Sequence, residues 1–326
     1  MMRKLFLAVM VLALFSGCNK DSTAYIGNWI KKSDFEGIPR GNAVSFVLGD
    51  KVYFGTGFND SQDSEYLKDF WMYDTARDFW TKLPDFPGEP RIGGVAFTIN
   101  GKGYLGLGYN GKVKLKDFWE FDPAVNTWTR MTDFGGSARY GAVGFTLGNK
   151  GYIGTGYDDN DNRDFWEYDP TTNQWTQIAS MGGSKRQDAV AFTYNEKAYV
   201  CTGINNGTYL TDLWQFDPST GAWIQKTDLD NDDSWTITRS NATAFTFGTK
   251  CYVGLGYSSG VRSDFWEYDP TADTWVDKTG FEGSARQNAV SFVVNNRAYI
   301  ASGRTGSYYF DDIWEFKPND ELDEDD

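Results

Sequence analysis

The side chains best suited to chemistry in this chain are arginines and aspartates that recur in step, about every 50 residues. The arginines are Arg40, Arg91, Arg139, Arg186, Arg239 and Arg286. The aspartates at matching later positions are Asp69, Asp117, Asp164, Asp212, Asp264 and Asp312. Free guanidinium groups gathered in one place would bind an anion or a carboxylate. Arginines paired with the aspartates would instead be scaffold, which strict repetition favours, and the sequence leaves both interpretations open.

The residue two places after each arginine changes from repeat to repeat: Asn42, Gly93, Gly141, Asp188, Asn241 and Asn288. Tyr140, Gln187 and Gln287 lie beside members of this set. A ligand without six-fold symmetry needs a site whose residues differ, so these positions fit a binding site better than the uniform arginines do. The candidate ligand-binding set therefore includes Tyr140, Gln187, Asp188, Asn241 and Asn288, together with the six arginines.

Several kinds of chemistry are excluded by composition. The chain has no histidine, which removes histidine acid–base catalysis, Ser-His-Asp nucleophiles and histidine-bound metals. Cys201 and Cys251 occupy different positions in their repeats, so neither a disulfide nor a thiolate zinc site is expected. Acidic loops at 158–162 and 228–232 could offer oxygen ligands to calcium but lack the glycine and glutamate of an EF-hand. We expect solvated loops there, with no metal and no cofactor.

Tryptophans reveal the elements that must position these side chains. One series is Trp71, Trp119, Trp166, Trp214, Trp266 and Trp314. A second series is Trp29, Trp80, Trp128, Trp175, Trp223 and Trp275. A period near 50 residues, built of short aromatic strands, predicts an all-β propeller with one four-stranded sheet per repeat.

The third repeat shows the strand pattern most clearly. Alternating apolar and polar residues between Gly, Asn and Asp turns predict strands at 142–145, 151–157, 164–170 and 173–178. The sixth repeat lacks the tryptophan of its fourth strand, and the segment around Trp29 matches the missing piece. We therefore expect six blades, the last of them completed by the N-terminal strand, which would leave no sheet edge exposed.

This pattern resembles the kelch-repeat propeller family over residues 25–318. The matching features are the glycine-rich ends of the second strands (GTG at 55–57 and 154–156, GLG at 106–108 and 254–256), the tyrosine two residues upstream and the paired tryptophans. The family's Gly-Gly doublet appears here as Gly-x-Gly. The resemblance implies the fold and says little of activity, because such propellers include both enzymes and binding modules.

Loop lengths distinguish the two faces of the expected ring. Turns between first and second strands, and between third and fourth strands, are constant in length, whereas the loops on the other face vary. The variable loops include 59–68, with Tyr66, and the insertion 228–238, with Trp235. Variable loops on a rigid scaffold are where binding usually occurs. Trp235 is either a stacking platform for a sugar, an anchor for a partner, or a side chain folded back onto its blade.

The two ends are expected to lie outside the ring. Residues 1–17 have the basic and apolar regions of a signal peptide, and LFSGC resembles a bacterial lipobox, which implies lipidation of Cys18. We expect a lipid-anchored linker at 18–24 and a disordered acidic tail at 319–326. The protein would then be an outer-membrane lipoprotein, on the periplasmic side or at the cell surface. Its net charge of −14 argues against nucleic acid as a partner.

These features favour a monomeric, non-enzymatic module that binds a glycan or a protein partner through the variable-loop face. The alternative is an enzyme: kelch propellers similar to this one include sialic-acid mutarotases, whose small acidic sugar would suit an arginine-lined mouth and need no metal. Free arginines would favour this metal-independent carbohydrate-active enzyme. Arginine–aspartate pairs throughout would favour the binding module.

Overall fold

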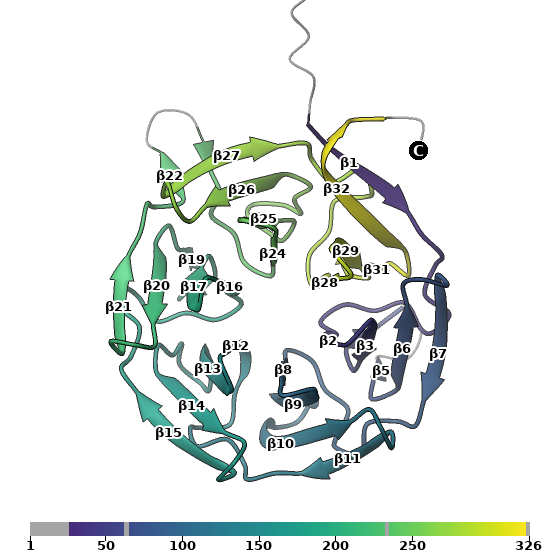
Figure 1. Ribbon diagram of the computed structural model, residues 1–326, viewed down its shortest axis with the longest axis vertical. Helices are drawn as coiled ribbons and strands as arrows, with labels where there is room; N and C mark the ends of the chain where they lie inside the picture. Colours follow the sequence, from purple (N-terminus) through teal and green to yellow (C-terminus); the bar gives the residue numbers. More distant parts are fainter. Residues whose placement is uncertain (1–25, 62–64, 232–234, 324–326) are drawn as a thin grey trace, which may run out of the picture.

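The computed structural model describes residues 26–61, 65–231 and 235–323. Six four-stranded antiparallel sheets stand around a central axis like the blades of a propeller (Figure 1). Within the described ranges every regular element is a strand, and no helix there is long and apolar enough to cross a membrane. The predicted all-β, six-bladed architecture is confirmed.

Each blade runs from an inner first strand to an outer fourth strand. Blade one contains β2 (Val44–Leu48), β3 (Lys51–Gly55), β6 (Phe70–Asp74) and β7 (Phe79–Leu83). Blade two contains β8 (Val95–Ile99), β9 (Lys102–Tyr109), β10 (Lys114–Asp122) and β11 (Thr127–Arg130). Blade three contains β12 (Tyr140–Leu147), β13 (Lys150–Tyr157), β14 (Phe165–Asp169) and β15 (Gln174–Ile178).

The remaining blades repeat this order. Blade four contains β16 (Val190–Tyr194), β17 (Lys197–Cys201), β20 (Leu213–Asp217) and β21 (Ala222–Gln225). Blade five contains β24 (Thr243–Phe247), β25 (Lys250–Gly254), β26 (Phe265–Asp269) and β27 (Thr274–Lys278). Blade six contains β28 (Val290–Val294), β29 (Arg297–Ala301), β32 (Ile313–Glu321) and β1 (Ile26–Lys31).

Blade six joins the two ends of the chain, as the sequence predicts. In the register of β1 and β32, Trp29 lies opposite Phe316 and Asn28 opposite Lys317. The Trp29 side chain is fully buried, with its ring centroid 4.4 Å from that of Phe316. Strand β32 continues to Glu321, so its last three residues lie within the segment 319–326 for which the sequence predicts disorder.

Aromatic side chains fill the gaps between blades. In several blades a phenylalanine of the third strand packs against the tryptophan of the next blade's fourth strand. Ring centroids are 5.0 Å apart for Phe70 and Trp128, and 5.0 Å apart for Phe118 and Trp175. Phe265 contacts Trp29 of the closing strand in the same way, at 5.0 Å. These large, rigid rings bury apolar area at each blade interface.

Short hairpins extend several of the variable loops, which the sequence analysis treats as irregular. Three of them join second to third strands: β4 (Phe58–Asn59) with β5 (Glu65–Tyr66), β18 (Ile204–Asn205) with β19 (Thr208–Tyr209), and β30 (Arg304–Thr305) with β31 (Tyr308–Tyr309). A fourth, β22 (Asp230–Asn231) with β23 (Trp235–Thr236), lies in the insertion between blades four and five.

Candidate functional site at the channel mouth

The six recurring arginines are buried, with at most 1% of each residue exposed. Arg91 is typical: its Nε donates to the Glu89 carbonyl at 2.9 Å and its Nη1 to the Leu107 carbonyl at 2.9 Å. Its guanidinium also makes two bonds to the Asp117 carboxylate, at 2.7 and 2.8 Å. Trp119 donates its Nε1 hydrogen to the same carboxylate at 2.7 Å.

This arginine–aspartate–tryptophan unit occurs in every blade. Burial alone would raise the pKa of Asp69, but hydrogen bonds from Arg40 outweigh it and hold that pKa below the ordinary range. The same balance lowers the pKa of Asp312 beside Arg286. Because their donors are engaged inside the blades, the arginines form the scaffold that the sequence left as one of two possibilities.

The carbonyl bound by each arginine belongs to the middle residue of the Gly-x-Gly motif. These residues have φ between 57° and 61°: Thr56, Leu107, Thr155, Thr202, Leu255 and Ser302. Left-handed backbone is unfavourable for such residues. It turns the carbonyl toward the guanidinium, and in blade two it lets the next amide, of Gly108, donate to the Arg139 carbonyl of the following blade at 2.8 Å. The arginines therefore link neighbouring blades as well.

The six variable positions gather at one end of the central channel and line a single cavity of about 170 Å³. We call this cavity the channel mouth, lined by Asn42, Gly93, Gly141, Asp188, Asn241 and Asn288 together with adjacent alanines and a glycine. All six have φ between 53° and 63°. Amides link them around the ring; for example, Asp188 donates to the Gly141 carbonyl at 2.9 Å. Asn, Asp and Gly tolerate this backbone best, which gives their types a conformational reason.

The side chains at the mouth are not symmetric. Gly93 and Gly141 leave one wall bare, whereas Asn288 donates from Nδ2 to the Asn42 Oδ1 at 2.6 Å and the Asn241 Oδ1 at 2.7 Å. Asp188 stands next to the bare wall, since a Cβ on Gly141 would lie 2.6 Å from its Oδ1. Burial and the nearby Asp161 raise the pKa of Asp188 to about 6.

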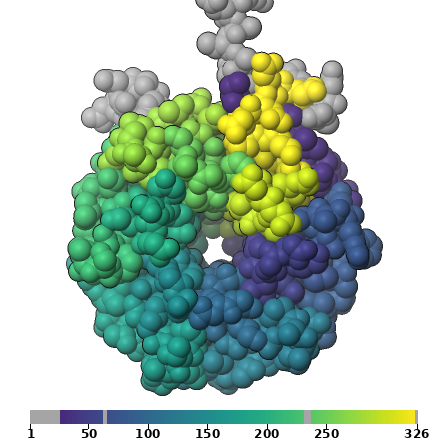
Figure 2. Space-filling view, viewed as in Figure 1, coloured from purple at the N-terminus to yellow at the C-terminus, as the bar shows by residue number. Residues whose placement is uncertain are grey.

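Below the mouth, the channel is lined by Ala, Gly, Ser, Val, Thr and Phe side chains. Among the described residues that line the mouth and the channel, Asp188 alone is ionisable. The space-filling view shows the opening at the centre of the ring (Figure 2). A ligand at the mouth would therefore meet hydrogen-bonding amides and one carboxyl group.

An arc of aromatic side chains curves beside the mouth across three blades. Ring centroids are 6.2 Å apart for Tyr66 and Tyr109, 5.8 Å for Tyr109 and Tyr140, and 5.5 Å for Tyr140 and Tyr157. Phe58 extends the arc, 4.8 Å from Tyr66. We call these five residues the aromatic arc; each is partly exposed.

Two members of the arc, Tyr66 and Tyr140, are predicted from the sequence, and the other three were missed. Phe58, Tyr109 and Tyr157 directly follow the Gly-x-Gly motif in their repeats, so the repeat alignment contains the signal that could have found them. The arc reaches the mouth at Tyr140, whose Cβ lies 3.3 Å from the position of a Cβ on Gly93. Lys114 lies 5.4 Å from the Tyr157 ring centroid, at the far end of the arc.

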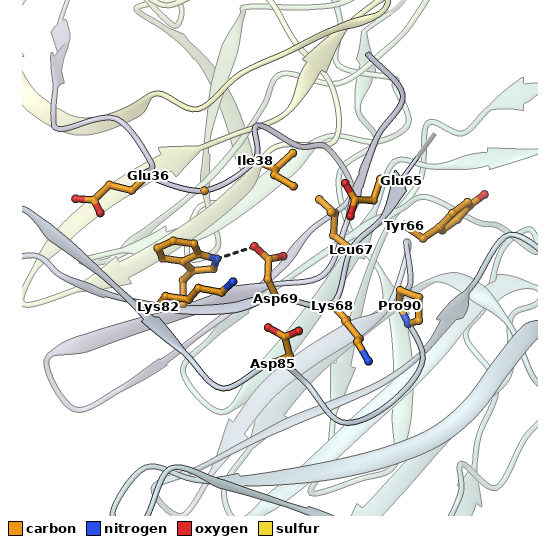
Figure 3. Close-up of a pocket in the computed structure, with 12 residues that line it drawn as sticks. Glu36, Ile38, Glu65, Tyr66, Leu67, Lys68, Asp69, Lys82, Asp85 and Pro90 are labelled. Carbon is orange, nitrogen blue, oxygen red and sulfur yellow. Dashed lines mark hydrogen bonds between the residues drawn. The ribbon is translucent and has the colours of Figure 1, made fainter. Parts of the chain in front are cut away.

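Tyr66 also borders a surface cavity of about 640 Å³ beside blade one (Figure 3). Its walls carry charges of both signs, from Lys68 and Lys82 and from Glu65 and Asp85. The dashed line in Figure 3 marks the hydrogen bond from the Trp71 indole to Asp69, which belongs to the scaffold unit of this blade. The cavity therefore offers mixed polar groups beside an aromatic wall.

Gln187 and Trp235 are the remaining residues that the sequence predicts for the site. Gln187 lies next to Asp188, and its backbone pairs with Ile204 at 3.1 and 3.0 Å. Trp235 lies opposite Asn231 in the hairpin β22–β23, but its side chain is outside the described part of the structure. The hairpin is flanked by Leu229 and Ile237, which are fully buried, so the insertion is held onto the ring.

The described residues contain neither a disulfide bond nor a group of side chains arranged to bind a metal ion. Cys201 and Cys251 are free and buried, and burial raises the pKa of both thiols. No group of three or more Asp, Glu or Cys residues in the described ranges is arranged to hold a metal ion.

Comparison with known proteins adds the family. A model described as the KLHDC2/KLHL20/DRC7 Kelch-repeats domain matches residues 28–188 and 137–283. The chain belongs to the kelch-repeat family. A solved neighbour in fold, titled "Structure of YjhT", superposes with a TM-score of 0.71 at 18% identity, covering 86% of this chain and 95% of that one. At this identity the likeness shows the fold.

A curated protein matches part of the chain in sequence. The N-acetylneuraminate epimerase of Yersinia enterocolitica is 34% identical over 92 residues, which are 27% of this chain and 24% of that protein. The match thus spans about a quarter of the relative's length. The likeness to this protein therefore covers only part of the ring.

Proposed function

We propose that this propeller is a carbohydrate-binding module and that its site is the channel mouth together with the aromatic arc. The observation that carries the proposal is the arc itself, which brings partly exposed tyrosine rings from three blades to the border of a cavity lined by amides. Aromatic faces stack on the apolar faces of sugar rings, and Asn and Asp side chains bond sugar hydroxyls.

The ring arginines bear on the choice between binding module and enzyme. All six are held in bidentate pairs with aspartates, the arrangement that favours a binding module. The 34% identical stretch of an N-acetylneuraminate epimerase supports sugars as the ligand class over a protein partner.

The experiment is a glycan screen on the purified protein followed by calorimetry, with Tyr140→Ala as the test variant. We expect at least about a tenfold loss of affinity, since one well-placed aromatic contact contributes on the order of 1.5 kcal/mol. The control is Phe79→Ala, because Phe79 is 53% exposed on the turn between third and fourth strands, on the opposite face. Equal effects of the two variants, or no sugar ligand at all, would contradict the proposal.

A second candidate is a metal-independent enzyme acting on an acidic sugar, as the name of the epimerase relative suggests. The observation that favours it is the Asp188 carboxyl group, whose pKa of about 6 suits proton transfer near neutral pH. Nuclear magnetic resonance of N-acetylneuraminate with and without the protein would show any faster exchange of its anomers. Unchanged exchange rates would remove this candidate.

We further propose that the protein is a monomeric lipoprotein anchored through Cys18 to the outer membrane, on the periplasmic side or at the cell surface. The support is the signal-like composition of residues 1–17 and the lipobox-like LFSGC. These residues lie outside the described part of the structure. A chain of net charge −14 is not expected to bind nucleic acid.

A further inference from the structure

We propose that Asp188 sets the ligand specificity of the channel mouth, so that the mouth binds uncharged sugars and rejects carboxylated ones at neutral pH. This inference rests on the proposed carbohydrate site and names its ligand class. It runs against the name of the epimerase relative, which refers to an acidic sugar.

The side chains that line the channel mouth can carry only negative charge. The described residues of the mouth and the channel below it carry one ionisable side chain, that of Asp188. An ionised Asp188 in a narrow cavity of about 170 Å³ repels a ligand carboxylate, because little solvent screens the two charges. Sugar hydroxyls, in contrast, can donate to the same carboxylate.

The neighbouring cations are either paired with acids or lie across the mouth from Asp188. Arg186, two residues before Asp188, gives both of its Nη2 contacts to Asp212 at 2.6 and 2.7 Å. Arg304 lies near Gly41 and Asn288 on the far side of the mouth, but its Nη1 donates to the Gly306 carbonyl at 3.1 Å. Lys114, at the far end of the arc, pairs with Asp159 at 2.6 Å.

The groups that face Asp188 from neighbouring elements are also acidic or uncharged. Asp161, from the loop between β13 and β14, is buried, with one oxygen bonded to the Asn206 amide at 3.0 Å and the other without a partner. Tyr140 faces Asp188 from β12, and burial, followed by the charge of Asp188, raises the tyrosine's pKa. Asn241 and Gly141 complete the surroundings without charge. A second acidic group therefore lies near the carboxyl of Asp188, and none of these neighbours is a cation.

The test compares two ligands of the same shape, N-acetylneuraminate and its uncharged carboxamide, by calorimetry on the full protein. At pH 7.5 we expect the carboxamide to bind at least about fivefold more tightly, the effect of one repulsive contact of about 1 kcal/mol. At pH 5 the preference should shrink, because Asp188 takes up a proton while the ligand carboxylate stays ionised.

Asp188→Asn should bring the two affinities together at both pH values. This variant keeps the fold, because asparagine already occupies the equivalent left-handed positions 42, 241 and 288. The control is Glu196→Gln, which makes the same charge change in the same blade, on the exposed turn between β16 and β17 at the opposite face. We expect it to retain the wild-type preference.

The outcomes separate this inference from the proposal beneath it. Equal affinities in the wild-type protein at pH 7.5, or a preference that survives Asp188→Asn, would overturn the specificity role while leaving a sugar site in place. If neither ligand binds and the glycan screen finds no sugar ligand either, the carbohydrate site itself fails, and the specificity role fails with it.

Discussion

At the scale of single residues, the regular spacing of the arginines predicts some of their contacts and misses others. The arginines looked like ligand-binding candidates because of their charge, yet each one ties the backbone of its own blade to an aspartate and a tryptophan. Their pairing partners could be predicted from the matched period. The carbonyl partners could not, because a left-handed Thr or Leu within a strand end contradicts single-residue preferences.

The scaffold role of the arginines predicts a large loss of stability on truncation. Arg139→Ala would remove the guanidinium donor from the carbonyls of Thr155 and Ser137 and from the Asp164 carboxylate, which would keep only the Trp166 indole. We expect a loss of about 3 to 5 kcal/mol in the free energy of unfolding, measured by urea denaturation. Arg130→Ala is the matched control, since Arg130 is exposed and its contacts are an ion pair with Asp133 three residues later and a cation–π contact with the Trp119 ring at 6.0 Å.

The control should lose no more than about 1 kcal/mol. Similar losses in both variants would show that the buried pair does not hold the blade together.

At the scale of strands and turns, the glycines of the second strands are required for two different reasons, backbone conformation and close packing. Gly156 has φ of +90°, a conformation that disfavours other residues. Gly154 has ordinary strand geometry, but a Cβ on it would lie 2.4 Å from the Phe165 ring. The motif is recognisable in the sequence, whereas the reason for Gly154 depends on the neighbouring third strand.

Close packing at Gly154 predicts that Gly154→Ala destabilises the protein by about 3 kcal/mol, from overpacking against the phenylalanine. Gly148→Ala is the comparison, because a Cβ at this turn glycine meets nothing within 4 Å. Its φ of +54° should cost about 1 kcal/mol. Thermal unfolding of both variants checks this difference.

A double variant makes the cause explicit. In a Phe165→Ala background, the added methyl group of Gly154→Ala has room, so its cost should fall by at least about 1 kcal/mol. Additive costs would show that the clash with Phe165 is not the reason.

At the scale of the whole molecule, the ring could be predicted almost completely and its binding face only in outline. The tryptophan period leads directly to six blades and to closure by the segment around Trp29. The aromatic arc escaped because its rings come from different repeats and meet only when the blades are arranged around the axis. The mouth residues were located, but their types reflect the left-handed backbone that they share.

The position of β1 also bears on how the molecule would be anchored. The chain enters the ring at Ile26, at the outer rim of blade six (Figure 1). We expect Cys18→Ser to move the protein from the membrane fraction to the soluble fraction without changing its thermal unfolding, since Cys18 precedes the ring. Detergent fractionation measures this, with Cys251→Ala as the control that keeps the anchor. A Cys18→Ser protein that stays with the membrane would contradict lipid attachment there.

Closure of the ring has a consequence for how the protein is made. The backbone amide of Asp323 donates to the Asn28 side chain, 295 residues earlier in the chain. While the polypeptide is being synthesised or exported, blades one to five can assemble in order, but β1 waits for β32 with an open edge and an uncovered Trp29. Unpaired strand edges associate readily with other chains. Pairing between the two ends of the chain is therefore expected to make folding slow, and the edge of β1 open to aggregation until β32 pairs with it.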